Sequence, residues 1–133
     1  MSEHLDFTIS HDLWLTANGS RGTTRGGIYQ RATITRQLRL MAKVEALAAL
    51  ARGEITRHTV PCVVTVSITY PRVGRADPPN AYPTVKPLID GIVDAGIWPD
   101  DNSRWIPSMT FTRSPGRSTP TTHDIAIMWK EAC

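Results

Sequence analysis

The stretch VPCVVTVSITY, residues 60–70, constrains the fold of this chain more than any other segment. Its apolar side chains recur at every second position: Val60, Cys62, Val64, Val66, Ile68 and Tyr70. Thr65, Ser67 and Thr69 fall on the other face. A period of two is typical of a β-strand with one face against a core. The segment therefore predicts a central strand whose apolar face is covered by a second layer of structure.

Five further segments complete the expected order of elements. Residues 7–15 alternate loosely and predict a first strand, and residues 33–52 show the apolar spacing of a long helix. Residues 84–96 predict a shorter helix, and alternating runs at 105–111 and 125–129 predict a closing antiparallel hairpin. The order β-α-β-α-β-β indicates an α+β domain, in which a small mixed sheet packs with two helices. The 133 residues fit one such domain, residues 1–133.

The first expected helix has an apolar face and a basic face. Its predicted buried stripe consists of Ile34, Leu38, Met41, Val44 and Ala48, extended by Leu40, Leu47 and Ala51. Arg36, Arg39 and Lys43 point the opposite way, and Gly53 is placed to cap the helix. Residues 21–57 contain eight Lys or Arg and two Glu. This surface is either a phosphate-binding face or a solvated helix face, and charge alone does not decide between them.

The second expected helix follows a loop rich in proline. Pro78, Pro79 and Pro83 are expected to keep that loop stiff and free of regular structure. Thr84 is the expected N-cap of the helix, and Gly96 is expected to end it.

A loop rich in glycine and arginine is expected earlier in the chain, at about residues 16–30. Its sequence begins TANGSRGTTRGG and contains no core-forming residue. Such a loop is either a phosphate-binding arm or a tolerated surface insertion.

Several functional classes receive no support from the sequence. No apolar run approaches the roughly 18 residues of a membrane span, and the N-terminus lacks a signal-peptide pattern, so a cytoplasmic protein without a membrane partner is expected. Two cysteines indicate neither a disulfide framework nor a metal cluster. The histidines are interpreted as surface or strand residues: His4, His11, His58 and His123.

Carboxylates crowd the second expected helix and the loops beside it. Lys86, Asp90 and Asp94 are four residues apart and share a helix face, where Lys86 and Asp90 can form an ion pair and Asp94 is expected to lie in water. Asp100 and Asp101 follow the helix C-terminus, where the helix dipole disfavours negative charge and a compensating cation such as Mg²⁺ is expected. The alternative is that Asp100 starts an ordinary turn in the sequence PDDN.

A family resemblance is carried by Asp77, Asn80, Lys86, Asp90 and the sequence GIWPDD at residues 96–101. This order resembles the signature of the RusA family of Holliday-junction resolvases. That signature is an Asp-x-Asp-Asn motif, then a Lys, an Asp four residues later, and a Gly-x-x-x-Asp-Asp turn. From Lys86 onward the spacing agrees with the family pattern, so the resemblance covers about a fifth of the chain closely and the rest by order of elements.

Two departures from the family pattern lie before Lys86. Pro79 stands where the family has its second motif Asp, and three extra residues separate Asn80 from Lys86. We therefore expect either Asp90 or Asp100 to supply the missing carboxylate, or the metal to keep an additional water.

The resemblance implies a small homodimeric endonuclease that binds four-way DNA junctions and nicks opposing strands symmetrically. It implies Mg²⁺ as cofactor, with Mn²⁺ as a substitute. The implied catalytic residues are Asp77, Asn80, Lys86 and Asp101. The implied metal ligands are Asp77 and Asp101, with Asp100 and Asp90 as the further candidates. The candidate DNA-binding residues are Asn18, Arg21, Arg25, Arg72 and Arg75.

Two other functions remain open at this stage. One is a metal-dependent nuclease that cuts other branched DNA, such as flaps or forks. The other is a non-catalytic DNA-binding protein in which Pro79 marks a decayed site.

Overall fold

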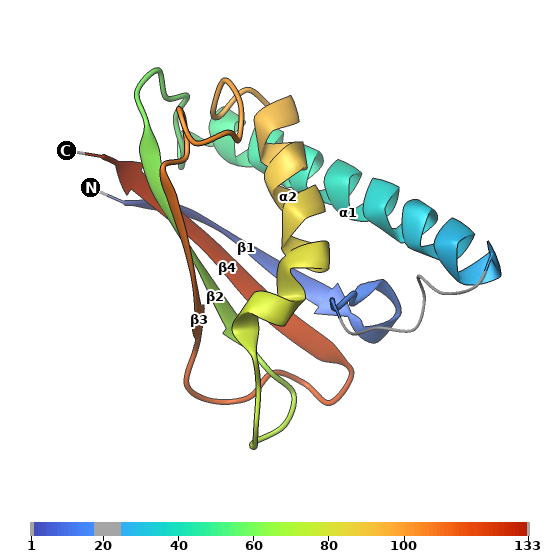
Figure 1. Ribbon diagram of the computed structural model, residues 1–133. Coiled ribbons are helices and arrows are strands. Elements are labelled where there is room, and N and C mark those ends of the chain that lie inside the picture. Colours follow the sequence, from blue (N-terminus) through green and yellow to red (C-terminus); the bar gives the residue numbers. More distant parts are fainter. Residues whose placement is uncertain (1, 18–24, 133) are drawn as a thin grey trace.

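The computed structural model describes residues 2–17 and 25–132, and it forms two layers (Figure 1). One layer is a four-stranded mixed sheet in the order β1-β4-β2-β3. Its strands are β1 (Glu3–Ser10), β2 (Cys62–Thr69), β3 (Ser108–Arg113) and β4 (Thr122–Glu131). The helices α1 (Arg25–Ala51) and α2 (Tyr82–Asp94) lie together on one face of the sheet. The expected α+β class, with a mixed sheet and two helices, is confirmed.

The apolar face of the central strand is buried as predicted from Cys62 to Ile68. Cys62, Val64, Val66 and Ile68 of β2 are at most 1% exposed. Val60 and Tyr70, which were expected on the same face, lie outside β2, and Val60 is exposed. The inward residues of β1 and β4 complete this face of the sheet: Leu5, Phe7, Ile9, Ile125, Ile127 and Trp129. The side chains of both helices close the core from above.

The predicted closing hairpin is wrong, because β3 and β4 are not neighbours. β4 lies between β1 and β2 and is antiparallel to both, whereas β3 runs parallel to β2 at the edge of the sheet. β2, α2 and β3 therefore form a β-α-β unit. The alternation of the two segments identified them as strands, but alternation carries no information about which strand each one pairs with.

The first strand lies earlier than predicted. β1 spans residues 3–10, and the chain then turns through a short 3₁₀ helix, η1 (His11–Leu13). Leu15 is buried, but it follows this turn and is not in a strand. The apolar residues at 13 and 15 continued the alternating pattern without continuing the strand.

α1 begins at Arg25, so residues 25–30 of the expected loop are helical. Its buried residues are Ile34, Leu38, Ala42, Ala46 and Ala49. Leu40, Val44 and Leu47, which were expected in the buried stripe, are exposed. Ala42 lies against Gly91 of α2, and its small side chain lets the two helices approach closely.

Gly91 of α2 lies at the point of closest approach. A Cβ atom at this position would lie 2.8 Å from the Cβ of Ala42 and from the backbone nitrogen of Lys43, and closer still to the carbonyl oxygen of Arg39. Only glycine fits this crossing without a shift of one helix.

α2 begins two residues before the predicted start. Pro78 and Pro79 open a 3₁₀ helix, η3 (Pro78–Ala81), and Pro83 lies in the first turn of α2, so the expectation of irregular structure is wrong. Thr84 is inside the helix and is not its N-cap. Its buried hydroxyl accepts a hydrogen bond from the Leu15 backbone N–H and donates one to the Leu15 carbonyl, both at 2.7 Å. Thr84 thus fastens the segment after β1 to α2.

Both helices end where glycine was expected. Gly53 and Gly96 have φ values of 75° and 85°. After α2, the Gly96 N–H donates to the Val93 carbonyl at 2.8 Å and the Ile97 N–H donates to the Ile92 carbonyl at 3.3 Å. This pair of bonds is a Schellman cap, in which glycine adopts the left-handed conformation. In the part of the chain that the structure describes, no helix is long and apolar enough to cross a membrane.

Candidate functional site

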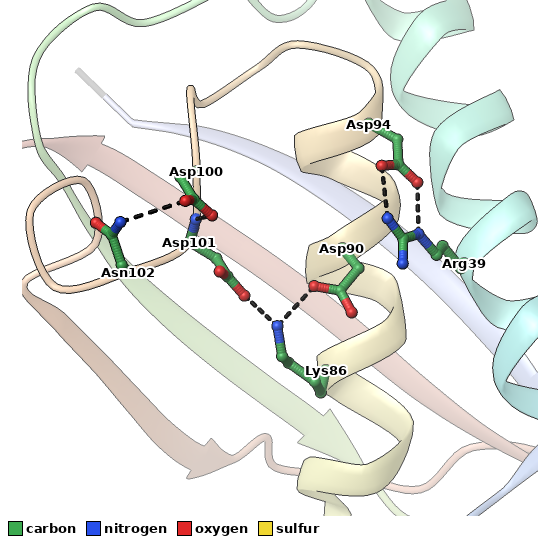
Figure 2. Close-up of polar contacts among 7 residues, drawn as sticks. All are labelled: Arg39, Lys86, Asp90, Asp94, Asp100, Asp101 and Asn102. Atoms are coloured by element: carbon green, nitrogen blue, oxygen red, sulfur yellow. Dashed lines mark hydrogen bonds and ion pairs between the residues drawn. The ribbon is translucent and has the colours of Figure 1, made fainter.

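A lysine on α2 contacts two carboxylates from different segments (Figure 2). The Nζ atom of Lys86 donates a hydrogen bond to Asp90 Oδ1 at 2.6 Å and a short one to Asp101 Oδ2. Asp90 lies one turn further along α2, and Asp101 lies in the loop between α2 and β3. The side chains of Lys86, Asp90 and Asp101 are 39%, 25% and 24% exposed, so the cluster is half-buried.

The loop that carries Asp101 is fixed by buried residues before it. Ile97 and Trp98 are at most 1% exposed, and the Trp98 ring meets the Trp129 ring edge-on with centroids 5.1 Å apart. Gly96 turns the chain at the end of α2, and the two apolar residues anchor it to the sheet. Asp101 is therefore brought back beside the helix that carries Lys86.

Asp100 is occupied by the turn itself. Its Oδ1 accepts a hydrogen bond from the Asp101 backbone N–H at 2.7 Å, and its Oδ2 accepts one from the Asn102 side chain at 3.3 Å. This is the turn role that the sequence PDDN indicated. Asp100 is adjacent to the Lys86 cluster in Figure 2, but it does not contact Lys86.

Lys86 and Asp101 stabilise each other's charged forms. Burial alone would lower the pKa of Lys86, but hydrogen bonds to Asp101 and Asp90 outweigh it and raise the pKa above its ordinary value. The hydrogen bond from Lys86 lowers the pKa of Asp101, against the opposing effect of burial. At neutral pH the lysine is therefore a cation and Asp101 an anion. A lysine in this state donates hydrogen bonds and does not accept a proton.

The prediction that Asp94 lies unpaired in water is wrong. Arg39 of α1 binds it with both arms of its guanidinium group, Nε to Oδ2 at 2.6 Å and Nη2 to Oδ1 at 2.8 Å. These hydrogen bonds lower the pKa of Asp94 and raise that of Arg39, and Asp90 and Asp101 add to the effect on Arg39. Figure 2 shows this pair one turn above Asp90. Arg39 is thus a second cation near the cluster, whereas the sequence had placed it on a basic helix face that was either phosphate-binding or solvated.

Asp77 and Asn80 are not joined to this cluster. The Asp77 side chain is exposed and does not cap η3, and the Asn80 backbone N–H donates to the Asp77 carbonyl at 3.0 Å. The Asn80 carbonyl accepts a hydrogen bond from the Ala17 N–H at 2.9 Å. Over residues 2–17 and 25–132, no hydrogen bond or ion pair links either side chain to Lys86, Asp90 or Asp101.

The candidate DNA-binding residues fall into two groups. Arg72 and Arg75 are exposed on the loop that follows β2. Asn18 and Arg21 lie outside the described residues, and so does the side chain of Arg25, the first residue of α1.

The histidines take structural positions. His4 and His11 are exposed, and His123 is a buried strand residue of β4, as interpreted. His58 is different, because it is nearly buried in the loop after α1. Its ring nitrogens lie 2.7 Å from Glu3 Oε1 and 3.1 Å from Glu131 Oε1. This contact joins the loop to the outer ends of β1 and β4, and no sequence spacing indicated it.

The carboxylate oxygens of the Lys86 cluster are ligands of the kind that Mg²⁺ prefers, although fewer carboxylates lie together than the resemblance implied. Among the described residues, no group of three or more His, Cys, Asp or Glu side chains is placed to hold a metal ion. Mg²⁺ is commonly bound by one or two carboxylates, with water and substrate phosphate filling its other positions. Asp90 and Asp101 form such a pair, because both already contact one cationic group.

Comparison with known proteins gives no assignment. No family model matches this chain, and a search of curated proteins finds no match.

Proposed function

We propose that this chain is a Mg²⁺-dependent endodeoxyribonuclease of the RusA type, which resolves four-way DNA junctions as a homodimer. The observation that carries the proposal is the contact of Lys86 with two half-buried carboxylates from separate segments of a basic protein. The family resemblance of the sequence supplies the junction substrate and the paired nicks. A two-fold dimer suits a junction of near two-fold symmetry.

Asp90 and Asp101 are the proposed metal ligands. The sequence left Asp90 and Asp100 as candidates to replace the carboxylate missing at Pro79. Asp90 is favoured because it shares a cation with Asp101, whereas both oxygens of Asp100 accept hydrogen bonds within its own turn. These ligands would hold Mg²⁺, which would supply Lewis-acid activation of water and charge neutralisation at the scissile phosphate.

Lys86 is proposed to stabilise negative charge on the phosphate. Its ammonium group has three N–H donors, of which Asp90 and Asp101 accept two, so one remains for a phosphate oxygen. A lysine ammonium group is charged at neutral pH, so the proposed role of Lys86 is electrostatic rather than that of a general base. The surrounding arginines would hold the DNA backbone and offset the repulsion between carboxylates and phosphates.

Cleavage of a labelled synthetic four-way junction, a Y-fork and a linear duplex, each with Mg²⁺ or with chelator, tests the proposal. Asp90→Asn and Asp101→Asn are expected to reduce junction cleavage by about 10²-fold or more while junction binding persists. Asp100→Asn is the matched control, because an asparagine oxygen can still accept the hydrogen bond that forms the turn. Equal activity in all variants would remove these carboxylates from the reaction. Asp77→Asn in the same series tests the ligand that the resemblance implied.

Metal binding can be measured apart from cleavage. Lys86 competes with a metal for the same two carboxylates, so Lys86→Met is expected to bind Mn²⁺ more tightly, as followed by electron paramagnetic resonance, while losing cleavage. Weaker Mn²⁺ binding by Lys86→Met would show that Asp90 and Asp101 are not the ligands.

The strongest rival is a DNA-binding protein without catalysis. One observation favours it: Lys86 already forms an ion pair with each of the two carboxylates, so the site has an internal partner for them without a metal. Junction binding that is independent of metal, with no cleavage in any divalent cation, would establish the rival. Cleavage of the Y-fork in preference to the junction would instead favour a nuclease for other branched DNA.

A further inference from the structure

Two loops protrude from the same end of the sheet and enclose a groove. One follows β2 at residues 70–77, and the other follows β3 at residues 114–121 (Figure 1). The groove between them has a volume of about 650 Å³. Its lining includes Arg113 and Arg117, and no carboxylate belongs to the lining among the described residues. The groove is separate from the Lys86 cluster, but its first wall leads directly through η3 into the helix that carries Lys86.

Arg113 fixes the first wall of the groove. Its guanidinium group donates a hydrogen bond to the Arg72 carbonyl at 2.9 Å and a shorter one to the Gly74 carbonyl. The same group lies over the Tyr70 ring, 5.2 Å from its centroid. Arg113 therefore ties down the backbone on both sides of Val73.

The second wall is fastened to the first by backbone hydrogen bonds. The Ser114 N–H donates to the Ile68 carbonyl at 2.8 Å, and the Ser118 N–H donates to the Tyr70 carbonyl at 3.0 Å. Behind them, the Tyr70 ring meets the buried His123 ring edge-on at 5.4 Å, and His123 stacks on Trp14 at 3.7 Å. The groove thus rests on a packed aromatic base.

Val73 is exposed at the tip of this fastened loop. It is 78% exposed, and it lies between two exposed arginines, Arg72 and Arg75. Exposure of a large apolar side chain has a hydration cost, which the folded chain does not relieve here. An apolar side chain between cations is the arrangement by which proteins insert between base pairs and partly unstack them.

We infer that the groove binds the backbone of a DNA strand and that Val73 inserts against the bases at a branch point. The inference rests on the proposed function for the choice of branched DNA. Arg117, which lines the groove, and Arg72, which is exposed next to the lining residue Val73, contact phosphates, and Arg113 holds the loop in position. A branch point favours insertion over continuous duplex, because the bases there have already lost part of their stacking. Among the described residues, the groove is lined by two arginines and by no carboxylate, and it lies open between two loops. These features favour a polyanionic strand as the ligand over a cation or an apolar peptide.

Binding is measured in chelator by fluorescence anisotropy, so the test needs no cleavage. The probes are a four-way junction and a linear duplex of the same sequence, each titrated over a range of salt concentrations. Arg72→Ala and Arg117→Ala are each expected to weaken binding to both DNAs and to reduce the slope of log affinity against log salt by about 0.9. Lys130→Ala is the matched control: Lys130 is exposed near the far end of β4, so its loss should leave the slope unchanged.

Val73→Ala separates insertion from charge. It is expected to leave the salt slope unchanged and to lower the preference for junction over duplex by about threefold to tenfold. A 2-aminopurine base beside the branch point should fluoresce less with Val73→Ala than with the wild-type protein, because less unstacking occurs. All three substituted side chains are exposed, so loss of folding is not expected, and circular dichroism checks this.

Each outcome decides the inference. Unchanged slopes in Arg72→Ala and Arg117→Ala, or no DNA binding by the wild-type protein, would show that the groove does not hold a strand. An unchanged junction preference and an unchanged 2-aminopurine signal in Val73→Ala would overturn the insertion. If the wild-type protein shows these binding effects but cleaves nothing with Mg²⁺, the groove stands and the nuclease proposal fails.

Discussion

Replacement of Gly91 by alanine tests whether the close crossing of α1 and α2 depends on glycine at this position. Gly91 lies inside α2, where its missing side chain leaves room for the backbone of α1. The added Cβ atom would lie 2.8 Å from Ala42 Cβ and from the Lys43 nitrogen, 0.6 Å inside the 3.4 Å at which ordinary contact begins. The obstructing atoms are backbone or belong to a side chain without rotamers. The clash is therefore relieved only when one helix moves.

The expected loss of stability follows from two opposing effects. Overpacking of this kind costs about 1–3 kcal/mol, and contact with backbone places Gly91→Ala near ~3 kcal/mol. Alanine returns about 1 kcal/mol through its higher helix propensity. The free energy of unfolding should therefore fall by ~2 kcal/mol. For a domain of this size such a loss lowers the melting temperature by roughly 6–10 °C.

Urea denaturation followed by circular dichroism measures this loss. Gly26→Ala is the matched control, because Gly26 is also helical but has no atom within 4 Å of the added Cβ. The control should unfold at the same urea concentration as the wild-type protein or at a higher one. A Gly91→Ala protein within about 0.5 kcal/mol of wild type would refute the reasoning, because that crossing cannot accept a methyl group without movement.

Two further predictions concern charge. Burial, helped by the charge of His11, lowers the pKa of His123 to about 4 from its ordinary 6.5. Below pH 6.5 His123 takes up a proton in the unfolded chain, but in the folded chain it does so only near pH 4. As the pH falls from 6.5 to 4, the free energy of unfolding should therefore decrease by up to ~3 kcal/mol. His123→Phe keeps an aromatic ring against Trp14 and should reduce this dependence of the free energy of unfolding on pH, as measured by urea titrations at several pH values. The same pH dependence in the variant and the wild-type protein would contradict the prediction. The Arg39–Asp94 pair is partly exposed, and a double-mutant cycle with Arg39→Met and Asp94→Asn should give a coupling energy of about 0.5–1 kcal/mol. This coupling energy should decrease at high salt. A coupling energy near zero would show that the pair does not join α1 to α2.

The parts of the fold that could be predicted from the sequence are those with local causes. The alternation in β2 follows from burial of one face, and the ends of α1 and α2 follow from the left-handed conformation of Gly53 and Gly96. The buried face of α1 was predicted correctly at Ile34 and Leu38 and wrongly further along, where Val44 and Leu47 were expected to lie inward. The helix crossing at Gly91 requires alanines there and leaves Leu40 exposed, and this requirement comes from α2, more than 40 positions away in the chain.

The candidate site divides in the same way. The Lys86–Asp90 pair is a local consequence of helical spacing, and the sequence indicated it without reference to any family. The contribution of Asp101 depends on the Schellman cap and on the burial of Trp98, and only the resemblance placed it with Lys86. Arg39 was missed because its partner lies 55 positions away, on a helix whose crossing angle and distance no spacing rule gives.

The charges beside α2 also change the original argument for a metal ion. The sequence placed Asp100 and Asp101 against the negative end of the helix dipole and weighed a compensating cation against an ordinary turn. The folded chain supplies two cations beside these carboxylates, Lys86 for Asp90 and Asp101, and Arg39 for Asp94. Asp100 forms the turn and has no cationic partner among the described residues, so the dipole argument for a further cation is weakened but not removed. Asp90 and Asp101, the residues that would hold a metal, are the partners of Lys86 in the folded chain, so the same two carboxylates would serve both the lysine and the metal.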